Sequence, residues 1–113
     1  MVSANLGKVL VIVPTYNELE NIKLITAGIR SAEPRVDILI ADDNSPDGTG
    51  RVADELAASD NQIKVLHRSN KSGLGAAYLE AFDWAKQNNY DVVVEMDADG
   101  SHRPHDLVAM LIA

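Results

Sequence analysis

Short apolar runs alternate along the chain with longer stretches whose apolar residues recur at helical spacing. The runs are KVLVIV, VDILIA, IKVL and VVVEM, at residues 8–13, 36–41, 63–66 and 92–96. Their length and their content of β-branched residues predict strands that are buried on both faces. Pro14 directly follows the first run, and because proline has no N–H group we expect it to end the hydrogen-bonded ladder there.

The stretches between these runs predict helices. Apolar side chains recur every three or four residues from 18 to 33, from 52 to 57 and from 74 to 85. A fourth helix is expected after Pro104. Its apolar positions are Leu107, Val108, Met110 and Leu111. Before the second helix, the segment NSPDGTG at 44–50 predicts a tight turn.

This alternation predicts an α/β fold, with a mainly parallel sheet covered by helices and joined by right-handed crossovers. Ligands of such folds bind beyond the carboxyl ends of the strands. A polar segment follows every predicted strand: PTYNE at 14–18, DDNSPDG at 42–48, HRSNKSG at 67–73 and DADGSH at 97–102. We therefore expect one edge of the sheet to gather four carboxylates and two cations, which belong to Asp42, Asp43, Asp97, Asp99, Arg68 and Lys71.

Composition and charge limit the classes of partner. The chain has 113 residues, enough for one domain with one core. Its formal net charge of −7 argues against nucleic acid, and against an anionic membrane surface, as the main partner of these residues. No cysteine is present, which excludes disulfides and thiolate metal sites. No apolar run approaches the ~20 residues that a membrane-spanning helix needs.

Asp97 and Asp99 follow the last apolar run and are separated by one residue. At the turn from strand to loop their carboxylates can converge on one point, where they repel each other unless a cation lies between them. Hard oxygen ligands favour Mg²⁺ or Mn²⁺, and Mg²⁺ usually keeps positions for water and a substrate phosphate. The pair therefore predicts a metal-bound diphosphate, the alternative being that Asp99 or Ser101 caps the next helix.

Asp43 is the candidate for recognising the rest of a nucleotide. A carboxylate at the end of the second strand can accept hydrogen bonds from a nucleobase N–H or a ribose hydroxyl. We favour ligand binding for Asp43 and turn building for Asp47 and Gly48. For Arg68 and Lys71, which can meet phosphate, we favour the role of solvated loop charges.

Tyr16 and Glu18 follow the first strand, and two interpretations of them stay open. Tyr16 offers an aromatic face to a base, and Glu18 offers hydrogen-bond acceptors. Glu18 is equally an ordinary acidic residue in the first turn of a helix.

Four segments of the chain together resemble family 2 glycosyltransferases of the GT-A fold. They are VIVPTYNELENI, ADDNSPDGT, NKSGLGAAYLEAF and VVVEMDADGSHRP, in that order. The forms DDNSPDGT and MDADxSH are most similar to those of bacterial polyprenol-phosphate (dolichol-phosphate) mannosyltransferases. The resemblance covers essentially the whole chain but only the N-terminal half of a typical catalytic domain. It implies one truncated nucleotide-sugar-binding domain over residues 1–113, a Rossmann-like GT-A half with strand order 3-2-1-4.

The resemblance also implies a reaction and its site residues. The full enzyme would transfer mannose from GDP-mannose to polyprenyl phosphate with inversion, assisted by Mg²⁺ or Mn²⁺. The implied donor-binding residues are Pro14, Tyr16, Glu18, Ala41, Asp43, Asp97, Ala98 and Asp99. Asp97 and Asp99 would be the metal ligands and the catalytic residues. Ser101 stands where some members carry a glutamine ligand, and because a hydroxyl is a poorer ligand its role stays open.

The same resemblance leads to expectations about location and assembly. The acceptor-side residues of the family lie beyond residue 113, so we expect this chain to bind the donor without turning it over. The full-length protein would be cytoplasmic, at the inner face of the cytoplasmic membrane. Strand order 3-2-1-4 would leave the fourth strand at an uncovered edge, beside the apolar segment LVAMLIA. An uncovered edge favours pairing with another chain, so we expect a homo-oligomer.

Three rival functions fit part of the pattern. A nucleotidyltransferase would carry a loop rich in glycine and arginine after the first strand, where this chain has PTYNE. A receiver domain, which is a signalling module, would place its acidic pair after the first strand and its phosphoacceptor after the third. Here the pair follows the second strand, and the third ends in His67 and Arg68. A catalytically inactive nucleotide-binding fragment is the remaining alternative.

Overall fold

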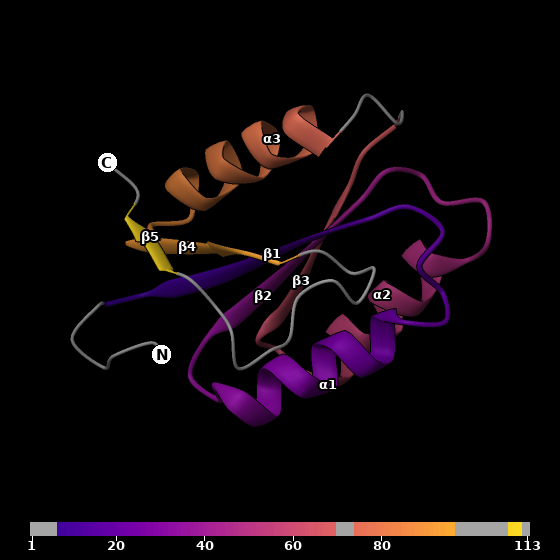
Figure 1. Cartoon of the computed structure of the whole chain (residues 1–113), viewed down its shortest axis with the longest axis horizontal. Coiled ribbons are helices and arrows are strands. Elements are labelled where there is room, and N and C mark those ends of the chain that lie inside the picture. Colours follow the sequence, from indigo (N-terminus) through magenta and orange to yellow (C-terminus); the bar gives the residue numbers. More distant parts are fainter. Residues whose placement is uncertain (1–6, 70–73, 97–108, 112–113) are drawn as a thin grey trace.

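The elements predicted from the apolar runs are present in the computed structural model, which describes residues 7–69, 74–96 and 109–111. One sheet is covered by helices on both of its faces (Figure 1). The strands are β1 (Val9–Thr15), β2 (Asp37–Asp42), β3 (Ile63–His67), β4 (Val92–Glu95) and β5 (Ala109–Leu111). The helices are α1 (Ile22–Ala32), α2 (Thr49–Ser59) and α3 (Leu74–Gln87).

The sheet has the order β3-β2-β1-β4-β5. Strands β1 to β4 are parallel, and β5 runs antiparallel to β4. The predicted α/β class and the predicted order 3-2-1-4 of the parallel strands are therefore confirmed. Among the described residues, no helix has the length and apolar character needed to cross a membrane.

Strict alternation along β1 divides the core between the two faces of the sheet. Val9, Val11 and Val13 pack with α1 and α2, whereas Leu10 and Ile12 pack with α3. All five side chains are at most 5% exposed. Burying a valine, leucine or isoleucine side chain contributes about 1.5–3 kcal/mol, so this strand alone is a substantial part of the core. Figure 1 shows the resulting layers, with α1 and α2 on one side and α3 on the other.

The predicted fourth helix is wrong where the structure describes it, because residues 109–111 form β5. Ala109, Met110 and Leu111 pair with Val94, Val93 and Val92 of β4, respectively. A short apolar run does not by itself distinguish a strand from a buried helix, and the free edge of β4 offers N–H and C=O groups that β5 satisfies. The expectation that β4 lies at an uncovered edge is wrong for the same reason, and the predicted homo-oligomer loses that basis.

Pro14 does not end β1, which continues to Thr15, but it does limit pairing on one side. The carbonyl of Thr15 faces β2, where it accepts the Asp43 N–H at 3.0 Å. Backbone groups of successive residues point to alternate sides. The carbonyl of Ile12 therefore faces β4, where it accepts the Met96 N–H at 3.0 Å. The next donor toward β4 would be the N–H group of residue 14, and because proline has no N–H group, β1 donates no hydrogen bond from that position.

Candidate functional site

The carboxyl ends of the parallel strands lie toward the same end of the sheet, on the right in Figure 1. The loops that leave β1 and β2 meet there, and β3 reaches the same edge because Asp42 pairs with His67 in register. The predicted gathering of polar segments at one edge is therefore confirmed for the described residues. Asp97, Ala98, Asp99, Ser101 and Lys71 lie outside the described residues.

Asp42 is the inward-facing carboxylate of this edge. Thr15 Oγ1 and Ser45 Oγ each donate to Asp42 Oδ1 at 2.6 Å, and the Ser45 N–H donates to Oδ2 at 3.0 Å. Asp42 is 2% exposed. A Cβ added to Gly50 would lie 3.0 Å from Asp42 Oδ2, so the start of α2 comes close to this carboxylate. Asp42 therefore joins the ends of β1 and β2 and offers little surface to a ligand.

Asp43 points elsewhere, toward a cation from the next strand. Arg68 Nη1 donates to Asp43 Oδ1, and the two side chains are 6% and 8% exposed. Arg68 Nε also donates to Glu80 Oε2 of α3 at 3.2 Å, and the Arg68 N–H donates to the carbonyl of Asp42 at 2.8 Å. The role of solvated loop charge that we favoured for Arg68 is wrong. A buried arginine needs a carboxylate partner, and β3 delivers this one beside Asp43.

One oxygen of Asp43 remains open. Oδ2 accepts no hydrogen bond from any described residue, whereas Oδ1 is held by Arg68. In the described part of the chain, no buried side-chain oxygen or nitrogen lacks a hydrogen-bond partner. Asp43 Oδ2 must therefore reach solvent. The pair with Arg68 fixes the direction in which this oxygen points, as a binding carboxylate requires.

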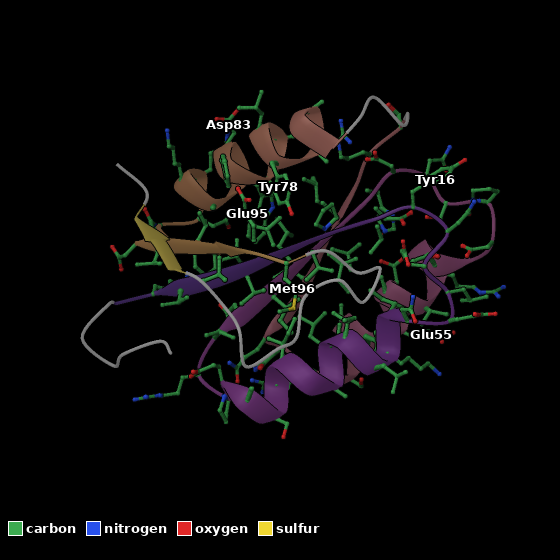
Figure 2. All side chains as sticks on the ribbon, in the orientation of Figure 1. Tyr16, Glu55, Tyr78, Asp83, Glu95 and Met96 are labelled. Carbon is green, nitrogen blue, oxygen red and sulfur yellow. The ribbon has the colours of Figure 1, made fainter. Side chains whose placement is uncertain are left out.

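Tyr16 and Glu18 lie in the loop between β1 and α1, and both are half-buried; Figure 2 shows Tyr16 at the carboxyl edge. The predicted helix start at Glu18 is wrong, since α1 begins at Ile22. The carbonyl of Glu18 accepts the N–H groups of Asn21 and Ile22, which makes a turn before the helix. Glu18 also accepts Asn21 Nδ2 at 3.3 Å.

An open hollow of about 300 Å³ lies beside this loop. Its lining is mostly polar and consists of Asn17, Glu18, Leu19, Glu20, Asn21 and Asp47. The turn-building role predicted for Asp47 and Gly48 is confirmed. Gly48 has a φ of +95°, which glycine adopts without strain, and Asp47 Oδ1 accepts the Thr49 N–H at 3.0 Å. The hydrogen bond from the Thr49 side chain lowers the pKa of Asp47.

Two residues of the implied donor pocket belong to the sheet itself. Ala41 pairs with Pro14 and Leu66 of the neighbouring strands and is fully buried. It offers no exposed surface in this structure, and its implied part in donor binding stays a prediction. Pro14 is half-buried where β1 nears its end.

The described residues contain no group of three or more histidine, aspartate or glutamate side chains that could hold a metal ion. The predicted metal ligands Asp97 and Asp99 lie outside this part of the chain. Met96, the residue before Asp97, is 1% exposed and bound through its N–H to β1. The residue that precedes Asp97 is thus held in place by β1.

Some residues at this edge matter only through neighbours from other elements, so their own positions in the sequence do not mark them. Thr15, Ser45 and Glu80 were not singled out within their segments, yet Thr15 and Ser45 donate to Asp42 and Glu80 accepts from Arg68. One signal was available. Asp42 and His67 are paired at the ends of the adjacent strands β2 and β3, so the residues that follow them, Asp43 and Arg68, are expected to lie side by side. Glu95 was counted only as part of a strand, but it is half-buried on the α3 side of β4, opposite Met96 (Figure 2).

Comparison with known proteins finds one matching family model and several similar proteins. The model of the family described as Glycosyl transferase family 2 matches residues 10–113. Polyprenol monophosphomannose synthase of Mycolicibacterium smegmatis is 56% identical over 107 residues, which are 94% of this chain and 40% of that protein. Undecaprenyl-phosphate mannosyltransferase of Micrococcus luteus is 53% identical over 106 residues, 94% of this chain and 44% of that protein. The chain therefore spans less than half the length of these relatives.

Solved structures share the fold. Mannosyltransferase PcManGT from Pyrobaculum calidifontis, in complex with GDP-Man and Mn²⁺, matches with a TM-score of 0.72 at 26% identity, over 82% of this chain and 28% of that one. GalNAc-T7 with UDP, GalNAc and Mn²⁺ matches with a TM-score of 0.71 at 20% identity, over 85% of this chain and 19% of that one. The second likeness concerns the fold alone.

Proposed function

Because the chain belongs to glycosyltransferase family 2, we propose that it is the donor-binding part of an enzyme that transfers mannose from GDP-mannose to a polyprenyl phosphate. The observation that carries this choice of reaction is the 56% identity to a polyprenol monophosphomannose synthase over nearly the whole chain. GDP-Man in the complex of PcManGT supports the choice of donor.

Asp43 is the base-recognition group in this proposal. Its open Oδ2 accepts the N1–H of guanine, while Arg68 holds Oδ1 and so keeps the carboxylate oriented. Adenine has no ring N–H at that position and leaves Asp43 Oδ2 without a donor, which is costly at a residue only 7% exposed. Tyr16 and Glu18, in the adjacent loop, complete the donor side.

Asp97 and Asp99 would hold Mg²⁺ or Mn²⁺, with Ser101 as an open third candidate. Two carboxylates without thiolates suit either hard ion, and the Mn²⁺ in the PcManGT complex supports this assignment. When bound, the ion offsets the negative charge that develops on the nucleoside diphosphate as it leaves.

The acceptor phosphate explains the lack of an obvious general base among the described residues. A phosphate monoester has a second pKa of about 6 and is mostly dianionic at neutral pH, so it attacks the sugar carbon without losing a proton to the protein. Direct attack inverts the configuration at that carbon. A lipid-linked acceptor places the full-length enzyme at the inner face of the cytoplasmic membrane in this proposal.

A binding-only role is the second candidate, because the chain spans 40% of the polyprenol monophosphomannose synthase that it matches. A receiver domain is not a candidate. Receiver sheets have the order 2-1-3-4-5, whereas this sheet has the order 3-2-1-4-5 with an antiparallel fifth strand.

Calorimetry with GDP, UDP and ADP, each with and without Mn²⁺, tests the proposal. We expect GDP to bind most tightly and its binding to require Mn²⁺. A mannosyl-transfer assay with polyprenyl phosphate then separates the two candidates, since the donor-binding part alone should show no turnover. Equal binding of GDP and ADP, or binding indifferent to Mn²⁺, contradicts the proposal.

A further inference from the structure

Three successive backbone amides in the loop after β1 are held by side-chain oxygens from the loop after β2 and from the first residue of α2. The distances are 3.0 to 3.2 Å, and the N–H groups of Asn17, Glu18 and Leu19 donate to Ser45 Oγ, Thr49 Oγ1 and Asp47 Oδ2, respectively. We call Ser45, Asp47 and Thr49 the bridging residues. They belong to the segment NSPDGT, for which turn building alone was expected.

The direction of each hydrogen bond in this network is fixed by a carboxylate. Ser45 Oγ donates its proton to Asp42 Oδ1, and Thr49 Oγ1 donates its proton to Asp47 Oδ1. An ionised carboxylate only accepts, so both hydroxyl protons are committed and the hydroxyl lone pairs are left for the amides. Networks with one self-consistent arrangement of donors rigidify the segments that they join.

The bridging residues are themselves held by the rigid start of α2. Thr49 is the first residue of α2 and is fully buried. The close approach of Gly50 to Asp42 leaves the first turn of α2 little room to move. The loop after β1 is thus attached to a helix end and a strand end, although Asn17 and Leu19 are exposed.

We propose that Ser45, Asp47 and Thr49 are positioning residues that hold the loop of Tyr16 and Glu18 in the shape that binds the donor nucleotide. The proposal rests on the proposed function, because it assigns that loop to the donor. The bridging residues act through the loop and do not touch the ligand.

The same contacts limit what the loop can do. Successive amides that point outward can form an anion-binding concavity. Here three of them, at 17–19, are committed to side chains of the protein. The loop therefore contributes its shape and the side chains of Tyr16 and Glu18 to donor binding. Other groups must stabilise the negative charge of the diphosphate.

Removing one bridging hydroxyl tests the role with matched controls. Thr49→Val deletes the acceptor for the Glu18 amide together with the donor to Asp47 Oδ1, and Thr49→Ser keeps both. Thr26→Val is the control, since Thr26 is also buried but bonds only to carbonyls of its own helix α1. Ser45→Ala is matched by Ser59→Ala, whose hydroxyl bonds only to the Leu56 carbonyl within α2.

Two measurements are made on each version of the chain: amide hydrogen exchange at residues 17–19 and GDP affinity in the presence of Mn²⁺. In Thr49→Val and Ser45→Ala we expect exchange to quicken at the released amide. GDP affinity should fall about two- to tenfold, because one net hydrogen bond no longer favours the binding-competent loop. Thr49→Ser should restore both values, and neither control should change them.

The outcomes separate this role from the proposed function. Faster exchange with unchanged GDP affinity overturns the positioning role and leaves the proposed function intact, as does an equal loss of affinity in the controls. Absence of GDP binding in the unaltered chain overturns the proposed function and this role with it. A well-folded Thr49→Val chain whose amides at 17–19 remain as protected as before overturns the network itself.

Discussion

Replacing Arg68 with methionine would leave the carboxylate of Asp43 buried without its cationic partner. The two side chains are 6% and 8% exposed, so water cannot replace the lost guanidinium without a rearrangement of the edge. Breaking a buried ion pair by removing one partner costs about 3–5 kcal/mol. The second bond of Arg68, to Glu80, adds less because Glu80 is 51% exposed.

That cost is large against a typical stability of ~5–15 kcal/mol for a domain. We therefore expect Arg68→Met to lower the midpoint of urea unfolding strongly. The double variant Arg68→Met with Asp43→Leu should recover much of the loss, because an apolar pair of similar size leaves no buried charge. Urea titration at neutral pH, followed by circular dichroism, measures all members of the double-mutant cycle.

The chain offers an internal comparison for this cycle. His67 and Asp54 also form a pair, at 2.8 Å, but their side chains are 54% and 58% exposed. An exposed pair of this kind contributes about 0–1 kcal/mol, so its cycle should give a coupling near zero. A cost for Arg68→Met below about 1 kcal/mol, or a coupling no larger than that of the exposed pair, would refute the inference that burial makes the Asp43–Arg68 pair essential.

Three further predictions concern the ligand and acid stability. Asp97→Ala and Asp99→Ala should each weaken nucleoside diphosphate binding in a folded chain, and calorimetry showing unchanged affinity in the double variant would exclude the metal assignment. Asp43→Asn should reduce the preference for GDP over ADP, and a preference equal to that of the unaltered chain would contradict base recognition by this carboxylate. The hydrogen bond from Arg30, at 2.7 Å, lowers the folded-state pKa of Asp60 below its ordinary value of 3.8. This contribution to stability is present above the ordinary pKa and is lost as pH falls through the folded pKa, so acid should destabilise Asp60→Asn less than the unaltered chain; equal acid sensitivity by urea titration would count against it.

The parallel sheet was predictable because its strands are apolar on both faces. The five residues from Val9 to Val13 are all apolar, so neither face of this strand can be exposed to solvent without a cost. Such a run is therefore expected in a central strand of the sheet. The alternation with helices then fixed the class, and the resemblance supplied the order of the strands. The polar segments followed the strands as expected, because all carboxyl ends of a parallel sheet share one edge.

What could not be predicted depended on partners that are distant in sequence. Arg68 looks like a loop charge until β3 is paired with β2, which sets it against Asp43. The start of α1 could not be placed from its apolar spacing, because the amides at 17–19 are held by side chains from residues 45–49. The strand at 109–111 depended on the free edge of β4, which is a property of the sheet and not of the run itself.

Pro14 stands in β1, the strand from which the sheet grows in both directions. The chain first adds β2 and β3 on one side of it and then crosses to add β4 on the other. This reversal is the topological switch point, beyond which ligands of open α/β sheets bind. An ordinary residue at position 14 would supply an N–H toward the carbonyl of Met96 and extend the β1–β4 pairing by one step. With a proline ring in place of that donor, the backbone of β1 cannot make this next hydrogen bond toward β4, so one residue withholds a step of strand pairing at the switch point.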